Sequence, residues 1–123
     1  MVSRTPHPIE GIWLPFKAEL AGDHAPDMAL AKMRLVLGAD TYAIYFGNEI
    51  ADEGRYTLGM ANEFSAIILA GVRGTNADRT IPSIYQLSGD RLRICYGIDG
   101  HAPTNFGSTS GTPHYLVSYR RIA

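Results

Sequence analysis

Apolar and polar residues alternate over many short segments of this chain, most clearly over residues 83–97. In that stretch Ile84-Tyr85-Gln86-Leu87 and residues 92–96 flank the pair Gly89-Asp90. A period of two predicts β-strands, and a Gly-Asp pair fits a hairpin turn because both residues tolerate positive φ. Residues 83–97 therefore predict two antiparallel strands joined by a tight turn.

The same alternation recurs along the chain and predicts eight strands. They are expected at residues 9–20, 33–37, 41–46, 49–58, 63–70, 80–87, 91–97 and 115–121. Most of them are separated by short turns, which favours an antiparallel meander. Eight strands in that order close well into an up-and-down barrel, because closure removes the exposed sheet edges. We therefore predict an all-β barrel, with a two-layer sandwich as the competing arrangement.

Three segments interrupt the strand pattern. Residues 1–8 include two prolines and predict a mobile lead-in to a single domain over residues 9–121. Residues 26–32 contain helix formers after Asp27, a suitable N-cap, so one or two helical turns are expected. Residues 98–113 predict the longest irregular segment, and loops of this length usually have a purpose in compact domains.

Composition narrows the classes of function. A formal net charge of -1 argues against a nucleic-acid partner, which normally requires a basic face. The sequence has neither an apolar run of signal-peptide length nor one of the ~20 residues that cross a membrane. The single cysteine, Cys95, permits no intrachain disulfide and fits a reducing compartment. We therefore expect a soluble cytoplasmic protein with no membrane partner.

One face of each strand is assigned to the barrel interior by the alternation. The expected inward set is Trp13, Met33, Leu35, Leu37, Tyr42, Ile44, Phe46, Tyr56, Leu58, Ile67, Leu69, Tyr85, Leu87, Leu92, Ile94, Tyr96, Tyr115, Val117 and Tyr119. Buried tyrosine hydroxyls need hydrogen-bond partners, so the interior is either a filled core or a partly polar pocket. The candidate ligand-binding residues are Tyr56, Tyr85 and Tyr96, with Arg93 near the rim.

The sequence offers little metal or catalytic chemistry. The histidines His7, His24, His101 and His114 lack the spacing of metal ligands, and Cys95 has no base beside it in the sequence. We therefore expect no metal, no cofactor and no enzymatic activity. An enzyme would become the better interpretation if the two histidines that flank the long loop met a carboxylate in a cleft.

Motifs distributed over residues 9–121 carry a resemblance to a known family. They are Gly11-Ile12-Trp13 and residues 34–35, 38–42, 53–58, 84–90, 92–96, 103–106 and 116–120. In this order and spacing the chain resembles the lipocalin-like (calycin-type) β-barrel domains of a largely uncharacterised bacterial family best known from planctomycetes. The resemblance implies an eight-stranded barrel and no established activity.

The resemblance also implies a closing contact at one end of the barrel. Lipocalins in the broad sense pack a tryptophan of the first strand against an arginine near the chain end. Trp13 matches the tryptophan, and Arg120 or Arg121 matches the arginine. Arg120 is the expected partner.

Two functions remain open at this point. The first is a binding protein that holds a small, mostly apolar molecule in the barrel, with segments 22–32 and 98–113 gating the mouth. The alternative is a protein-interaction or inhibitor module with a side-chain-filled barrel, which would present Phe106 and the rest of the 98–113 loop to a partner. Apolar residues expected on the outer face would also allow a homodimer.

Overall fold

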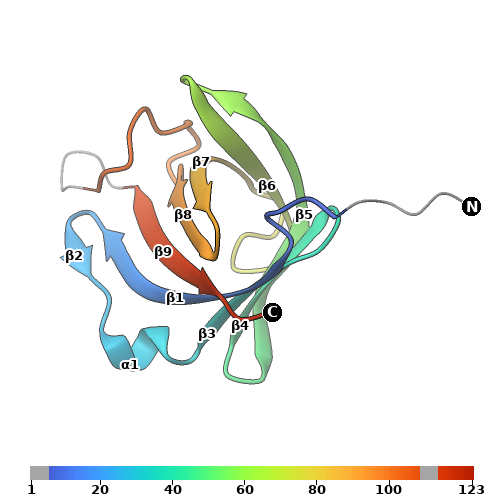
Figure 1. The fold of residues 1–123 in the computed structure, drawn as a ribbon, viewed down its shortest axis with the longest axis vertical. Helices are drawn as coiled ribbons and strands as arrows, with labels where there is room; N and C mark the ends of the chain where they lie inside the picture. The colour runs from blue at the N-terminus through green and yellow to red at the C-terminus, as the bar shows by residue number, and fades with distance from the viewer. Residues whose placement is uncertain (1–5, 109–113) are drawn as a thin grey trace, which may run out of the picture.

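The computed structural model describes residues 6–108 and 114–123, and this part of the chain contains nine strands and one short helix (Figure 1). The elements are β1 (Gly11–Leu20), β2 (Asp23–His24), α1 (Asp27–Leu30), β3 (Met33–Leu37), β4 (Thr41–Phe46), β5 (Glu49–Ala61), β6 (Phe64–Gly74), β7 (Thr80–Ser88), β8 (Arg91–Tyr96) and β9 (Tyr115–Arg121). Residues 1–5 of the expected lead-in and 109–113 of the expected long loop lie outside the described residues.

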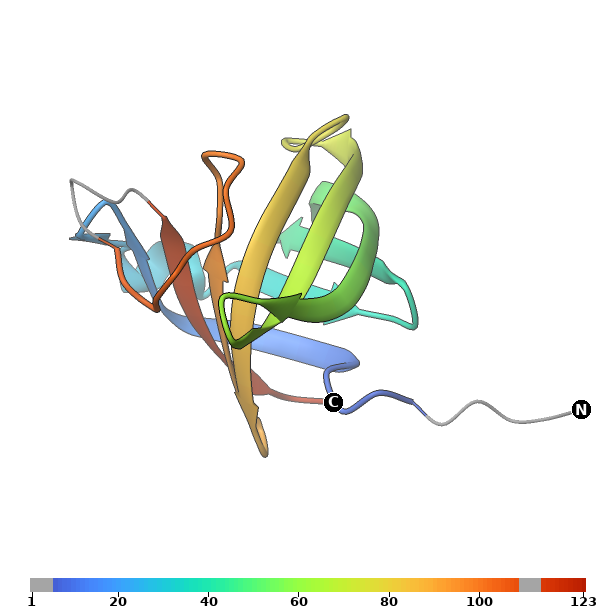
Figure 2. The same ribbon diagram turned by 90° about the horizontal axis from the view of Figure 1, so that it is seen from above.

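Eight of the strands form one closed antiparallel sheet. β1 and then β3 to β9 pair in succession, and β9 returns to pair with β1 (Figure 2). That last ladder runs from Trp13↔Arg121 to Leu20↔Tyr115, with a bulge between Pro15 and Lys17. The short β2 pairs only with the end of β1. The predicted up-and-down barrel is confirmed, and the chain does not form the competing sandwich.

The β5–β6 hairpin is longer than the sequence predicts. β5 continues past the expected end of its strand to Ala61, and β6 continues to Gly74, inside the expected 71–79 loop. The turn between them is Asn62-Glu63, and both residues have positive φ, at 51° and 70°. Gly59 and Gly71, each next to the end of an expected strand, lie within the β5–β6 ladder.

Alternate residues of the strands fill the barrel as predicted. Fully buried members of the expected inward set are Trp13, Ile67, Leu92, Ile94 and Val117. Two members of that set are instead exposed, Phe46 at 48% and Leu58 at 36%. Phe46 ends β4 and lies below the Lys32 ammonium, 5.9 Å from the ring centroid. Leu58 lies beyond Arg55, the last residue of β5 that pairs with β4. At Leu58 the β5 strand therefore has no β4 residue beside it.

The predicted helical segment is confirmed as a single turn, α1. Pro26 is the N-cap residue and Asp27 begins the helix, so the expected capping by the Asp27 side chain is wrong. Leu30 is buried against the barrel core and fixes the turn in place. In the described residues, no helix combines the length and the apolar character needed to cross a membrane.

One end of the barrel is closed by the segment that precedes β1. Ile9 is fully buried, and its carbonyl oxygen accepts a hydrogen bond of 2.9 Å from the Trp13 indole nitrogen. The C-terminus lies at the same end, because the Ile12 amide donates to the Ala123 carbonyl and the Ile122 amide donates back to Ile12. Both ends of the described chain therefore seal this end (Figure 2).

Arg121, rather than Arg120, makes the closing contact with Trp13. The Arg121 guanidinium carbon lies 4.3 Å from the centroid of the indole ring, whereas Arg120 is exposed. Trp13 and Arg121 are register partners, so their side chains leave the sheet on the same face. The expectation for Arg120 is wrong because alternation from the buried Tyr119 places it on the outside.

The segment after β8 covers part of the outer wall of the barrel. Ala66, Ile84 and Cys95 are register neighbours across β6, β7 and β8, and their row is buried although it faces outward. Pro103 is fully buried, and the Cys95 thiol donates a 3.8 Å hydrogen bond to the Gly107 carbonyl oxygen. The described part of the long loop therefore forms a second, small apolar cluster outside the barrel.

Candidate ligand cavity at the open end of the barrel

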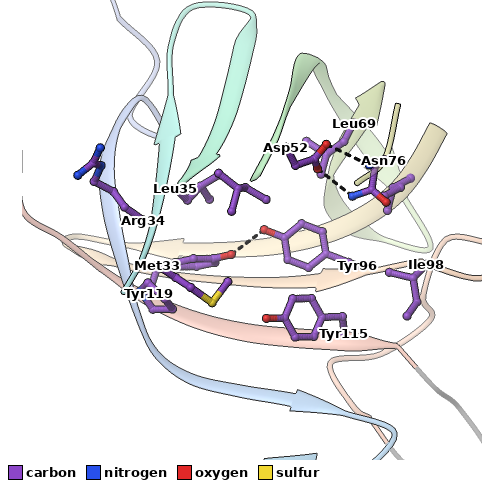
Figure 3. Close-up of a pocket in the computed structure, with 13 residues that line it drawn as sticks. Met33, Arg34, Leu35, Asp52, Leu69, Asn76, Tyr96, Ile98, Tyr115 and Tyr119 are labelled. Atoms are coloured by element: carbon purple, nitrogen blue, oxygen red, sulfur yellow. Dashed lines mark hydrogen bonds between the residues drawn. The ribbon is translucent and has the colours of Figure 1, made fainter. Parts of the chain in front are cut away.

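A cavity of about 80 Å³ occupies the barrel end opposite to the Trp13 contact (Figure 3). Because successive strands alternate in direction, the connections 21–32, 47–48 and 75–79 and the described part of the connection between β8 and β9 all lie at this end. Apolar lining comes from Met33, Leu35, Ile44, Leu69, Ile81 and Ile98. Polar lining comes from Asp52, Asn76, Tyr96, Tyr115 and Tyr119. The site is thus an apolar chamber with a few hydrogen-bonding groups, the usual composition of a small-molecule pocket.

Asp52 is the buried carboxylate of this cavity, with 3% of its surface exposed. Its oxygens accept hydrogen bonds from the Asn76 backbone amide at 3.2 Å and the Asn76 side-chain amide at 2.8 Å (Figure 3). The Tyr42 hydroxyl donates a third, at 3.3 Å. All three donors are neutral groups, so these contacts solvate the carboxylate without neutralising its charge.

Arg79 connects Asn76 to the opposite side of the mouth. One guanidinium nitrogen donates to the Asn76 side-chain oxygen at 3.2 Å, and another donates to the Ile98 carbonyl oxygen at 2.8 Å. The 75–79 turn is thereby held against the start of the loop that follows β8. This link sets the positions of Asn76 and Ile98 at the cavity.

Three tyrosines form the aromatic wall of the cavity. The hydroxyls of Tyr96 and Tyr119 share a hydrogen bond of 2.7 Å, and the rings of Tyr96 and Tyr115 stack with centroids 5.7 Å apart. Burial raises the pKa of both Tyr96 and Tyr119, and for Tyr96 the charge of Asp52 adds to the increase. These hydroxyls are therefore neutral at physiological pH and offer a ligand hydrogen bonds rather than charge.

Of the four predicted ligand-binding residues, only Tyr96 lines this cavity. Tyr56 is buried at the other end of the barrel, where its hydroxyl donates to the Gly38 carbonyl oxygen. Tyr85 contributes to a separate open groove beside the β5–β6 hairpin. Arg93 lies on the outer wall, with its guanidinium carbon 4.4 Å from the Phe106 ring centroid. The strand pattern identified inward tyrosines but not the end of the barrel at which each lies.

Asp52 and Asn76 are cavity residues that the sequence did not single out. Asp52 belongs to β5 and is buried on the same strand as Tyr56. Side chains alternate between the two faces of a strand, so residues four apart lie on the same face. Asp52 could therefore have been predicted to face inward, like Tyr56. Asn76 gave no such signal, because the turn after β6 places it.

The two histidines that flank the long loop both approach Asp99. His114 is buried and its Nε2 atom lies 3.9 Å from Asp99 Oδ2, while His101 donates its backbone amide to Asp99 Oδ1 at 3.0 Å. That backbone bond is the main cause of a lowered pKa at Asp99, and the charges of both histidines add to it. Ser108 Oγ donates to the His114 carbonyl oxygen rather than to its ring. In the described part of the chain, no group of three His, Cys, Asp or Glu residues is arranged to hold a metal.

The fold and the cavity define the class of this protein: a closed, eight-stranded, antiparallel up-and-down β-barrel, compatible with a calycin-like fold. Comparisons with protein-family models, with curated proteins and with solved structures give no match. Barrels of this class support many functions. An argument about function must therefore start from the cavity.

Proposed function

We propose that this chain is a lipocalin-like binding protein that holds a small, mostly apolar molecule in the cavity at the open end of its barrel. The supporting observation is the partly filled interior, where six apolar side chains face the Tyr96–Tyr119 hydroxyl pair across about 80 Å³. Apolar contacts would supply most of the binding energy, and the hydroxyls and Asn76 would orient the ligand.

The cavity volume limits the ligand. About 80 Å³ accommodates on the order of five to eight water-sized groups. A ligand of about five heavy atoms gains at most about 1.5 kcal/mol per atom, or about 7.5 kcal/mol in total. That corresponds to a dissociation constant of about 3 μM at best. A larger ligand would have to extend through the mouth between Asn76 and Ile98.

The alternative function, a protein-interaction module that uses the long loop, has less support. It requires an apolar loop tip, and Phe106 is the candidate. The Phe106 ring instead packs edge-on against Phe64 at 5.2 Å between centroids, with the Arg93 guanidinium on it. Asn62 holds the same loop through a 3.0 Å hydrogen bond to the Pro103 carbonyl oxygen. In the described part of the loop, Phe106 is thus packed on the barrel rather than presented to a partner.

Methyl NMR with xenon and benzene as probes tests the proposal. We expect both probes to shift the methyl signals of Ile44, Ile81 and Ile98, which line the cavity. The methyls of Ile84, under the outer loop, and Ile122, near the C-terminus, should stay unchanged.

A cavity-filling variant and a matched control complete the test. Ile44→Phe should abolish the shifts because the larger side chain occupies the space, whereas Ile68→Phe, at an exposed position, should leave them intact. The proposal is wrong if the probes shift outer and cavity methyls equally, or if Ile44→Phe still binds them.

A further inference from the structure

Asp52 brings a buried charge to the cavity without a cation beside it. Among the described residues, no Lys, Arg or His nitrogen lies within ion-pair distance of its carboxylate. A buried carboxylate is costly when it has no counter-charge, even when neutral groups donate hydrogen bonds to it. Its Oδ1 atom accepts one hydrogen bond, from the Asn76 amide, and a carboxylate oxygen can accept two. The site therefore has spare acceptor capacity.

The one basic residue in the described cavity wall does not offset this charge. Arg34 belongs to β3 between the inward Met33 and Leu35, so its side chain leaves the sheet on the outer face. Its guanidinium carbon lies 4.3 Å from the centroid of the Tyr45 ring. Figure 3 shows this side chain directed away from the other labelled residues. The Arg79 guanidinium is linked to Asp52 only through the Asn76 side chain at the mouth, so Asp52 is the charged group that lines the cavity itself.

The aromatic wall reinforces this polarity. Tyrosine faces carry negative quadrupole density and attract cations, and Tyr96 and Tyr115 line the same cavity as Asp52. Burial is the main cause of the raised pKa of both Tyr42 and Tyr96, and the charge of Asp52 adds to the increase at both.

We propose that the cavity selects a short-chain primary ammonium ion, with the nitrogen donating to Asp52 and the alkyl group lying against Leu35, Ile44 and Ile81. This inference rests on the proposed function and names the ligand class of the same site. A primary ammonium has the N–H donors that the free acceptor position of Asp52 requires, and a short alkyl chain fits the volume.

Asp52 also has a structural contact, since its bonds to Asn76 hold the 75–79 turn against β5. Two variants separate this contact from ligand selection. Asp52→Asn removes the charge, whereas Asn76→Ala breaks the side-chain contact and keeps the charge. If Asp52 only held the turn, the two variants would affect binding alike.

The test is an NMR titration of the full chain with butylammonium, 1-butanol and butyrate, which differ in charge but little in size. Wild type should bind butylammonium at least about tenfold more tightly than butanol, and butyrate least. Asp52→Asn should bring the ammonium-to-alcohol ratio close to one, whereas Asn76→Ala, which removes a lining side chain but keeps the charge, should weaken all three probes alike and leave that ratio unchanged. The amide spectrum of each variant reports whether it is folded.

Each outcome decides the question. Equal binding of the three probes by wild type, or a preference for butyrate, overturns the ammonium proposal and leaves apolar binding standing. Loss of selectivity in Asn76→Ala as well as in Asp52→Asn also overturns it. Failure of all three probes, and of xenon, removes the proposed function itself. If Asp52→Asn does not fold, the wild-type order of affinities decides alone.

Discussion

Arg121 connects four parts of the closed end through one side chain. Its guanidinium lies on the Trp13 ring, donates to the Glu10 carbonyl oxygen at 2.5 Å and to the Pro8 carbonyl oxygen, and approaches Asp90 at 3.3 Å. These contacts fasten the segment before β1 to the end of β9. At the scale of single residues, this is the clearest stabilising contact outside the apolar core.

Removing the Arg121 side chain should therefore destabilise the fold. We expect Arg121→Ala to lower the free energy of unfolding by roughly 1–3 kcal/mol, because it removes a cation–π contact and leaves two carbonyl oxygens without their donor. The neighbouring Arg120→Ala, at an exposed position, should change it by less than about 0.5 kcal/mol. Urea unfolding measures both, and equal effects would contradict the assigned partner.

The buried tyrosines should make the protein sensitive to alkaline pH. Burial raises the pKa of Tyr42, Tyr96, Tyr115 and Tyr119 above the ordinary value of 10.0. Below that value the stability from keeping them neutral is fully present. As pH rises above about 10, tyrosines ionise in the unfolded chain but not in the barrel, so the free energy of unfolding falls.

Ultraviolet titration of tyrosinate, with circular dichroism at the same pH values, measures this behaviour. Of the seven tyrosines, these four should ionise only as the fold is lost. Titration of all seven near pH 10 with the secondary structure retained would contradict their burial.

At the scale of elements, two glycines of β5 have very different surroundings. Gly54 lies at the bulge where β5 changes register against β6, and a Cβ atom there would lie 2.1 Å from the Ala70 carbonyl oxygen. Gly59 lies in the same strand, and a Cβ atom there would meet nothing within 4 Å. The close approach of the two backbones at Gly54 lets the long hairpin bend with the barrel.

These two positions provide a matched pair of substitutions. Gly54→Ala should lower the free energy of unfolding by about 1–3 kcal/mol, because the ladder must move apart to admit the methyl group. Gly59→Ala should be neutral or slightly stabilising, since alanine loses less backbone entropy on folding. Thermal unfolding compares the two, and an equal loss in both would argue against the close approach at the bulge.

The loop after β8 is a second element whose packing can be measured. Cys95 is fully buried under this loop, and burial also raises the pKa of its thiol. Native protein should therefore react slowly with a thiol reagent, which attacks the thiolate. Phe106→Ala should increase the labelling rate several-fold by loosening the loop, while Thr104→Ala, at an exposed loop position, should not. Fast labelling of wild type would show that the loop leaves the outer wall open.

At the scale of the whole molecule, alternation was enough to predict the barrel and most of its interior. It was correct for most positions and failed at Phe46, the last residue of β4 before the turn to β5, and at Leu58, which lies beyond the last residue of β5 that pairs with β4. The sequence predicted the cavity only in part. Asp52 and Asn76 meet through a turn whose shape depends on hydrogen bonds across the barrel mouth, and Arg79 fixes that turn from a third position.

Native mass spectrometry of the chain purified gently from its own host tests the central claim most directly, namely that the open end of the barrel is a binding site. The account predicts that part of the wild-type protein retains one small molecule, and that Ile44→Phe produced in the same way retains none. The claim would be contradicted if both proteins had the mass of the ligand-free chain. It would also be contradicted if the Ile44→Phe variant retained the same small molecule as wild type.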